Sequence, residues 1–180
     1  TRADTRYTQN RRGRATMRCA PTRLALGRRS KRSSGSSERV LRARLEDARF
    51  FWETDLAAGF NPWLSALDTV IFLAPLGSMG DKTRRIEHLC AWLADTVRCN
   101  SPEVSVAKNE AMRAGRLSKA DLVSAMVKEF DTLQGVMGGI YAAHFGESPV
   151  VSKAIAEQYL PAGPDSPVPA SLCGALLSIA

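Results

Sequence analysis

The sequence lacks the motifs that usually mark a catalytic or metal-binding domain. Its four cysteines form no C-x-x-C pair, which argues against a zinc site and favours free thiols in a reducing compartment. His88 and His144 are the only histidines and neither is followed by Asp, so a dinuclear metal site would lack ligands. Neither a G-x-x-x-x-G-K-[ST] phosphate loop nor a G-x-S-x-G nucleophile elbow occurs. No apolar run approaches the roughly 20 residues of a membrane span, and we expect no membrane contact.

Acidic residues are scarce in the first 37 positions. That segment holds ten arginines and one lysine against the single acid Asp4, so its net charge is +10. The net charge of the whole chain is only +7. Residues 38–180 therefore carry −3, and the basic pI says little about the binding surface of the folded part.

Residues 1–37 are also poor in apolar side chains, and 33–37 read Ser-Ser-Gly-Ser-Ser, which is typical of a flexible linker. Such a segment buries too little surface to offset its ordering entropy, so we predict a disordered, Arg- and Ser-rich basic arm. An RNA-binding arm, an organelle transit peptide and an unstructured extension without function all fit this composition.

Apolar periodicity predicts about six helices with short connections, and hence an all-α domain. The first runs from Glu38 to Leu56, followed by a connector to residue 72. Gly77–Gly80 reads as a turn, and a second long helix follows over 81–97. A helix starting at Ser101 should end at Gly115. Later helix starts are marked by Ser148-Pro149 and by Ser171. The last helix stops while still apolar, so we expect a domain truncated at its C-terminus.

In the first helix, Leu41, Leu45, Ala48 and Trp52 predict the buried stripe. Arg42, Glu46, Arg49 and Glu53 form an alternating-charge line that is typical of a solvated face, although its arginines could also contact a phosphate backbone.

Residues 119–139 form the most informative stretch. Ser118 followed by Asp121 resembles a capping box, and apolar positions then predict one helix from Lys119 to Phe130. Gly135, Gly138 and Gly139 lie in a second helical stripe, where each costs roughly 1 kcal/mol relative to alanine. They indicate either close packing of another backbone or a broken helix. The carboxylates of this stretch, Asp121, Glu129 and Asp131, are commoner as surface or capping groups than as catalytic ones.

Several long runs resemble one family, the β subunit of bacterial tetrameric glycyl-tRNA synthetase. They are ERVLRARLEDARFF at 38–51, LGSMGDKTRRI at 76–86, KADLVSAMVKEF with LQGVMGGIYA over 119–142, GE at 146–147 and AIAEQYLP at 154–161. Their order and spacing cover residues 38–180. Residues 73–75 read Leu-Ala-Pro, where the family often carries a polar or basic residue followed by Lys, and residues 1–37 match nothing in it.

The resemblance implies a fragment of a tRNA-binding subunit. The family's enzyme is an α2β2 assembly that joins glycine to its tRNA with ATP, and its α subunit carries the aminoacylation site. The fragment would comprise a disordered extension at 1–37, a long helix and connector at 38–72 and an incomplete HD-domain-like helical bundle at 73–180. The His-Asp pair of HD phosphohydrolases reads Ala120-Asp121 here, so the metal site looks lost. Neither metal nor cofactor is expected to bind this fragment, and its location is expected to be cytoplasmic.

If the matching region contacts tRNA, as the resemblance implies for the subunit, we expect exposed basic side chains to make the contacts. The candidates are Arg42, Arg44, Arg49, Lys82, Arg84, Arg85 and Lys119. Each would neutralise a phosphate, which makes binding dependent on salt, and each could equally be a solvated surface charge. Two other interpretations stay open, a metal-dependent HD-type phosphohydrolase and a gene remnant without function.

Overall fold

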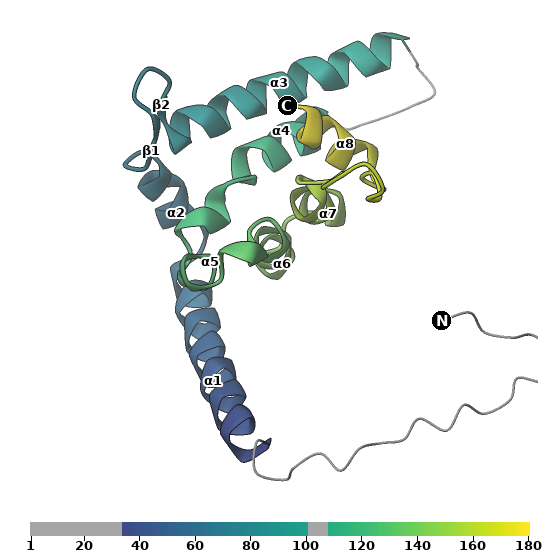
Figure 1. The fold of residues 1–180 in the computed structure, drawn as a ribbon. Helices are drawn as coiled ribbons and strands as arrows, with labels where there is room; N and C mark the ends of the chain where they lie inside the picture. The colour runs from purple at the N-terminus through teal and green to yellow at the C-terminus, as the bar shows by residue number, and fades with distance from the viewer. Residues whose placement is uncertain (1–33, 101–107) are drawn as a thin grey trace, which may run out of the picture. The chain divides into compact units, whose positions relative to one another are not determined.

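Helices dominate the residues that the structure describes. A computed structural model describes residues 34–100 and 108–180, with side chains from Ser37 onward. Nearly all of them belong to the second of two compact units, residues 40–180. The helices are α1 (Ser34–Ala58), α2 (Phe60–Leu67), α3 (Met79–Asn100), α4 (Lys108–Leu117), α5 (Ala125–Glu129), α6 (Val136–His144), α7 (Pro149–Glu157) and α8 (Leu172–Ile179), as Figure 1 shows. Short 3-10 helices lie at Ala120–Val123 (η1) and Asp131–Leu133 (η2). The all-α prediction is confirmed.

The predicted basic arm lies largely outside the described residues, as does the helix start expected at Ser101. Residues 34–37 belong both to the predicted arm and to the residues that the structure describes. Helix α1 begins at Ser34, so the residues 34–37 that were expected in a flexible linker are helical.

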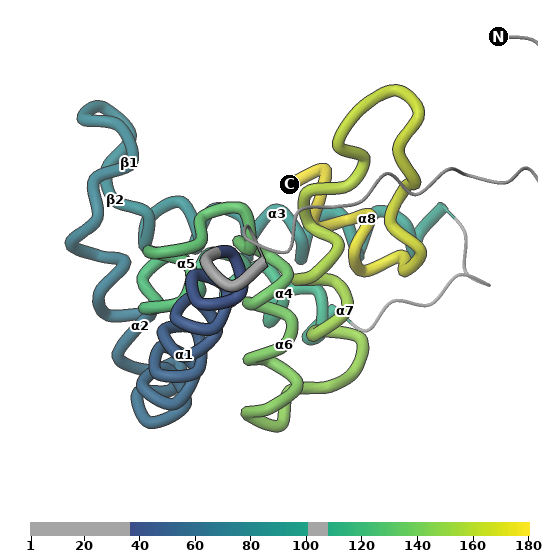
Figure 2. Tube along the Cα trace, turned by 60° about the horizontal axis from the view of Figure 1, so that its bottom comes forward, coloured from purple at the N-terminus to yellow at the C-terminus, as the bar shows by residue number. Residues whose placement is uncertain are grey.

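The core lies between α3, α4, α7 and α8. Helix α3 packs along α4, α7 packs on α4, α6 and α8, and Figure 2 shows α6 and α7 side by side. Cys90, Ala114, Leu117 and Ile155 are completely buried there. The prediction that Gly115 ends its helix is wrong, because α4 continues to Leu117. Its role is close packing, since a Cβ atom on Gly115 would lie 2.9 Å from the Cα atom of Glu87 in α3.

Serine hydroxyls begin three of the later helices. Ser124, Ser148 and Ser171 each accept a hydrogen bond from the backbone N–H three residues on, which satisfies a donor that the first turn leaves unpaired. The predicted starts at Ser148 and Ser171 are therefore confirmed.

The helix predicted over residues 119–130 is wrong. It is split into η1 and α5 at Ser124, whose backbone is extended (φ −66°, ψ 153°). Ser118 does not form the expected capping box, because its hydroxyl donates to the carbonyl of Gly115. Tertiary contacts of Asp121, described below, override the local helical pattern.

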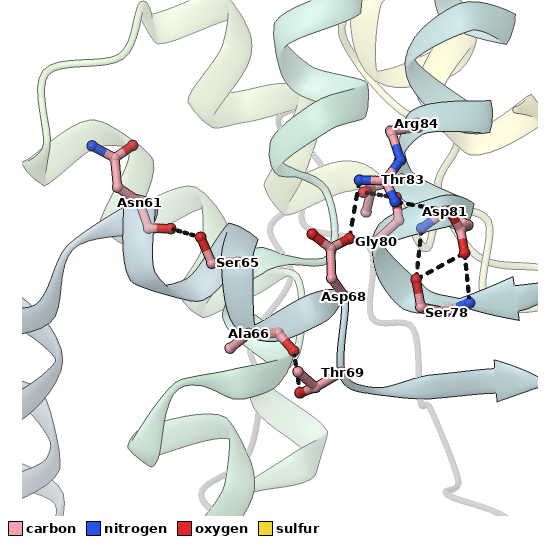
Figure 3. A network of polar contacts seen from close by, with 10 residues as sticks. All are labelled: Asn61, Ser65, Ala66, Asp68, Thr69, Ser78, Gly80, Asp81, Thr83 and Arg84. Carbon is pink, nitrogen blue, oxygen red and sulfur yellow. Dashed lines mark hydrogen bonds and ion pairs between the residues drawn. The ribbon is translucent and has the colours of Figure 1, made fainter.

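A small antiparallel hairpin, β1 (Ile71–Leu73) paired with β2 (Gly77–Ser78), precedes α3. The turn occupies residues 74–76 rather than the predicted 77–80, because Gly77 pairs with Leu73 and α3 starts immediately after Ser78. Ser78 and Asp81 form a reciprocal cap at this helix start (Figure 3). The Asp81 N–H donates to the Ser78 hydroxyl oxygen, and the Ser78 N–H donates to the Asp81 carboxylate.

Only part of the predicted stripe of α1 is covered. Ala48 and Trp52 pack against the core, and the Trp52 ring stacks on Tyr141 of α6 at 5.3 Å. Leu41 and Leu45, on the same stripe nearer the N-terminus, are 60% and 63% exposed, so their predicted burial is wrong. Along the described part of the chain, no helix combines the length and the apolar character needed to cross a membrane.

Candidate functional site

The carboxylate of Asp121 lies at the N-terminus of α6. Its Oδ2 atom accepts hydrogen bonds from the N–H of Gly135 at 2.6 Å and the N–H of Gly138 at 3.0 Å. These are donors that the first turn of a helix cannot satisfy internally, and a negative charge there is favoured by the helix dipole. Asp121 therefore caps a helix 14 residues further along the chain.

Burial sets the chemistry of this carboxylate. Asp121 is completely buried, and desolvation raises the pKa of its carboxyl group against the lowering effect of the two glycine N–H groups. Within the described residues its Oδ1 atom has no hydrogen-bond partner. Because this carboxyl group has no exposed surface, it cannot contact a substrate in solution. Its hydrogen bonds from two backbone N–H groups give it a structural role.

Gly135, Gly138 and Gly139 are each required for a different structural reason. Gly135 has a φ of +83° and precedes α6, which explains the break. A Cβ atom on Gly138 would lie 2.9 Å from both Asp121 Oδ2 and Ile155 Cγ2, and one on Gly139 would lie 2.7 Å from the carbonyl oxygen of Ser152. Both sequence-based alternatives, a helix break and close backbone packing, are therefore found.

A second buried carboxylate, Asp55, was missed by the sequence analysis. It is 2% exposed, and it accepts hydrogen bonds from the N–H groups of Ala125 and Met126 and from the Tyr141 hydroxyl. Burial and the adjacent carboxylate raise the pKa of Tyr141. The position of Asp55, three residues after Trp52 on the core side of α1, was the available signal, because an acid on an apolar stripe needs a partner.

Lys119 is the candidate with the most specific environment. Its ammonium group donates to Gln158 Oε1 at 2.7 Å and to the Tyr159 hydroxyl at 2.9 Å, and it lies 4.2 Å from the centre of the Tyr159 ring. Gln158 is fixed in turn, because its amide donates to the carbonyl of Ser118. Desolvation, followed by the positive charge of Lys82, lowers the pKa of Lys119 to about 8. Lys119 thus remains mostly protonated at neutral pH.

Lys82 comes from the first turn of α3 and lies over the Phe72 ring of the hairpin, 4.0 Å from its centre. It is close enough to Lys119 for its charge to lower that side chain's pKa. Among the residues that the structure describes, neither lysine forms an ion pair with a carboxylate. Two of the seven predicted basic side chains thus lie near each other without a direct ion pair, although the buried Asp121 carboxylate opposes the effect of Lys82 by raising the pKa of Lys119. Lys82, Lys119 and Tyr159 are called the lysine cluster below.

Arg84 and Arg85 have structural partners instead. Arg84 bridges Asp68 at 3.0 Å and Asp81 at 2.7 Å (Figure 3), and these contacts raise the pKa of Arg84 and hold the pKa of Asp81 well below its usual range. Arg85 donates to the carbonyl of Leu76 in the hairpin. Both side chains therefore fasten the hairpin region to α3.

The remaining candidates all lie on α1. Arg44 donates to Glu129 of α5 at 2.8 Å, and Arg49 pairs with Glu53 one turn on. Arg42 is exposed on the same helix. Exposed pairs of this kind contribute about 0–1 kcal/mol, so phosphate could displace them at little cost.

The other side chains that could bind a metal or react do not form a second site among the described residues. Among residues 34–100 and 108–180 no group of three or more His, Cys, Asp or Glu side chains could hold a metal ion. Cys90, Cys99 and Cys173 are free thiols, and Cys19 lies outside the described residues. His88 is exposed. An open hollow of about 340 Å³ is lined by Gly59, Phe145 and neighbouring residues, and its charged side chains, Arg113 and Glu147, are paired with each other at 2.6 Å.

Comparison with known proteins identifies the family. The family model described as "Glycyl-tRNA synthetase beta subunit" matches residues 28–180, so the expectation that residues 1–37 match nothing in the family is wrong for residues 28–37. The chain is similar to glycine–tRNA ligase beta subunits of Nitratidesulfovibrio vulgaris strain DP4 (71% identity over 143 residues), Lawsonia intracellularis (56% over 143) and Coxiella burnetii strain Dugway 5J108-111 (45% over 150). These alignments cover 79–83% of this chain but only 20–21% of each relative. The chain thus spans about a fifth of the length of the curated relatives it matches.

Proposed function

Because the chain belongs to the glycyl-tRNA synthetase β-subunit family, we propose that it supports aminoacylation of tRNA with glycine by binding tRNA, without an active site of its own. The chemistry, including the use of ATP, belongs to the whole enzyme, in which an α subunit is the partner in an α2β2 assembly. An HD-like bundle and a cytoplasmic location are parts of the same proposal.

The lysine cluster is the observation that carries the tRNA-binding proposal. It offers two ammonium groups and the hydroxyl of Tyr159, which is protonated at neutral pH as an ordinary tyrosine is. Gln158 and the two aromatic rings hold the ammonium groups in place, so little side-chain entropy is lost on binding. Three held donors that form no direct ion pair suit a backbone phosphate.

The two residues at the degenerate His-Asp position support the second half of the proposal. Ala120 offers no metal ligand, and Asp121 uses Oδ2 to cap α6 while completely buried. The local function of this pair is therefore to position α6 and, through the neighbouring Lys119, the binding surface.

The test is tRNA binding by the chain as a function of salt. Replacing both lysines, Lys82→Met and Lys119→Met, removes two phosphate contacts and should lower the slope of log affinity against log salt by about 2 in magnitude. A matched control is Lys128→Met with Lys153→Met, which removes the same charge from exposed positions elsewhere. Equal slopes for the two double variants would overturn the assignment of the cluster.

The pH dependence provides a second arm of this test. Because the pKa of Lys119 is about 8, affinity should fall as the pH rises from 7 to 9, and the Lys119→Met variant should lose that fall. A pH-independent affinity in the parent chain would contradict the proposed role of Lys119. Arg84 and Arg85 are less suitable for substitution, because their loss would also loosen the hairpin.

A further inference from the structure

Trp92 is a large aromatic residue on the outer side of α3. It is 62% exposed, whereas Cys90, two residues earlier, is completely buried. Two residues correspond to a rotation of about 200° around a helix, so the two side chains point in nearly opposite directions. The core helices α4 and α8 pack on α3 from the buried side (Figure 1). The indole of Trp92 therefore points away from the core.

Trp92 also differs from the other aromatic residues that the structure describes. Each of the other described Phe, Tyr and Trp rings lies against a second ring or beneath a lysine ammonium group. Within the described residues, no such contact involves Trp92. In that part of the chain its ring is thus an aromatic surface that no intramolecular ring or cation occupies.

Two cations lie on the same face of α3 as Trp92. Lys82, Arg85 and Trp92 are spaced three and seven residues apart, which places them on one side of the helix. Arg85 donates to a neutral acceptor, the carbonyl of Leu76. Among the described residues, neither cation forms an ion pair with a carboxylate.

The spacing along α3 suits a nucleic-acid strand. Arg85 and Trp92 are about 10 Å apart along the helix axis, which is the length of about three stacked nucleotides. A strand with phosphates at Lys82 and Arg85 can therefore place a base against the indole. The two cations favour an anionic ligand, because an apolar protein surface that covered them would desolvate both charges without pairing them.

We infer that Trp92 is a stacking surface for an unpaired base of the RNA whose phosphates the lysine cluster binds. This inference rests on the proposed tRNA-binding function, and it adds that the ligand at this face includes single-stranded nucleotides. The face of a base inside a stem is covered by its neighbours, whereas unpaired bases are free to stack on aromatic side chains. Such stacking accepts any base, because every base has a π face.

RNA affinity measured with two oligomers tests the inference on the 180-residue chain. One probe is a single-stranded oligoadenylate, and the other is an abasic ribose-phosphate oligomer with the same number of phosphates. Trp92→Ala should weaken the binding of oligoadenylate by at least about 5-fold, because a base–aromatic stack is lost. Its affinity for the abasic oligomer should stay within about 2-fold of the parent chain. Unchanged binding of oligoadenylate, or an equal loss with both oligomers, would overturn the inference.

Two further substitutions at this position separate stacking from a general apolar contact. Trp92→Phe keeps a ring and should bind oligoadenylate within about 3-fold of the parent chain. Trp92→Leu keeps only apolar surface and should bind it as weakly as Trp92→Ala does. Equal affinities of the Phe and Leu variants would overturn the stacking role.

Salt dependence separates a failure of this inference from a failure of the proposed function. Trp92→Ala removes no charge, so its slope of log affinity against log salt should equal that of the parent chain. Lys82→Met with Lys119→Met should lower the slope for both oligomers. A lowered slope in the lysine variant without any effect of Trp92→Ala would overturn the stacking inference alone. An unchanged slope in the lysine variant would overturn the role of the lysine cluster, even where Trp92→Ala weakens binding.

Discussion

At the scale of single residues, two buried carboxylates connect distant parts of the chain. Asp55 caps α5 from α1, and Asp121 caps α6 from η1. In each case the acceptor is a charged or chargeable group inside the protein, and the donors are N–H groups that would otherwise be buried without a partner. Side chains of this kind fix the relative positions of short helices that could not form alone.

Removing the Asp121 side chain should therefore be costly. Asp121→Ala leaves the N–H groups of Gly135 and Gly138 unsatisfied, and we expect it to lower the free energy of unfolding by about 2–3 kcal/mol. Urea denaturation measures the effect, with the exposed Asp131→Ala as the control, for which a change within about 0.5 kcal/mol is expected. Equal effects of the two substitutions would rule out the capping role.

The same carboxyl group gives a pH dependence with a defined sign. Its pKa is raised in the folded state, so between its ordinary value and the raised one the folded protein binds more protons than the unfolded protein. Stability therefore falls as the pH rises through that window. In the difference between the parent chain and Asp121→Asn, which cancels other titrating groups, this fall should remain, and its absence would show that the pKa is not raised.

At the scale of helices and turns, the sequence predicts where a helix begins better than whether it continues without a break. Ser148-Pro149 and Ser171 were recognised because a hydroxyl cap acts within three residues, and such local chemistry is visible in the sequence. The break at Ser124 was not recognised, because the pattern from Lys119 to Phe130 is helical and the competing interaction comes from Gly135 and Gly138. The covered part of the α1 stripe was predicted, but periodicity cannot tell which turns find a partner.

In the candidate site too, residue types could be read from the sequence, but contacts between distant residues could not. Basic side chains could be selected from the sequence, but the sequence does not show that Arg84 is bound by two carboxylates or that Lys119 and Lys82 approach each other. Asp55 was missed because its three donors come from residues 70 to 86 positions away.

The close packing of α6 on α7 predicts that a larger side chain at Gly138 destabilises the protein. Alanine usually stabilises a helix over glycine by about 1 kcal/mol, yet Gly138→Ala would place a Cβ atom 2.9 Å from Asp121 Oδ2 and Ile155 Cγ2. We expect this substitution to lower the free energy of unfolding by about 1–3 kcal/mol. Gly163→Ala, which meets nothing within 4 Å, should be neutral. A stabilised Gly138→Ala variant would mean that α6 and α7 are not in close contact.

At the scale of the whole molecule, the chain belongs to a family whose curated relatives are about five times as long as the region they share with it. Under the proposal made above, the lysine cluster is the part of this helical segment that binds a tRNA phosphate.

The most direct test of the central claim is the steady-state kinetics of the reconstituted enzyme, with this segment in a full-length β subunit and the α subunit present. For Lys82→Met with Lys119→Met, the KM for tRNA should rise about 5- to 10-fold, because two phosphate contacts are lost, whereas kcat and the KM values for glycine and ATP should stay unchanged. The Lys128→Met and Lys153→Met control should match the parent enzyme. A lowered kcat with an unchanged KM for tRNA would contradict the account, because it would place the cluster in the chemistry rather than in tRNA binding.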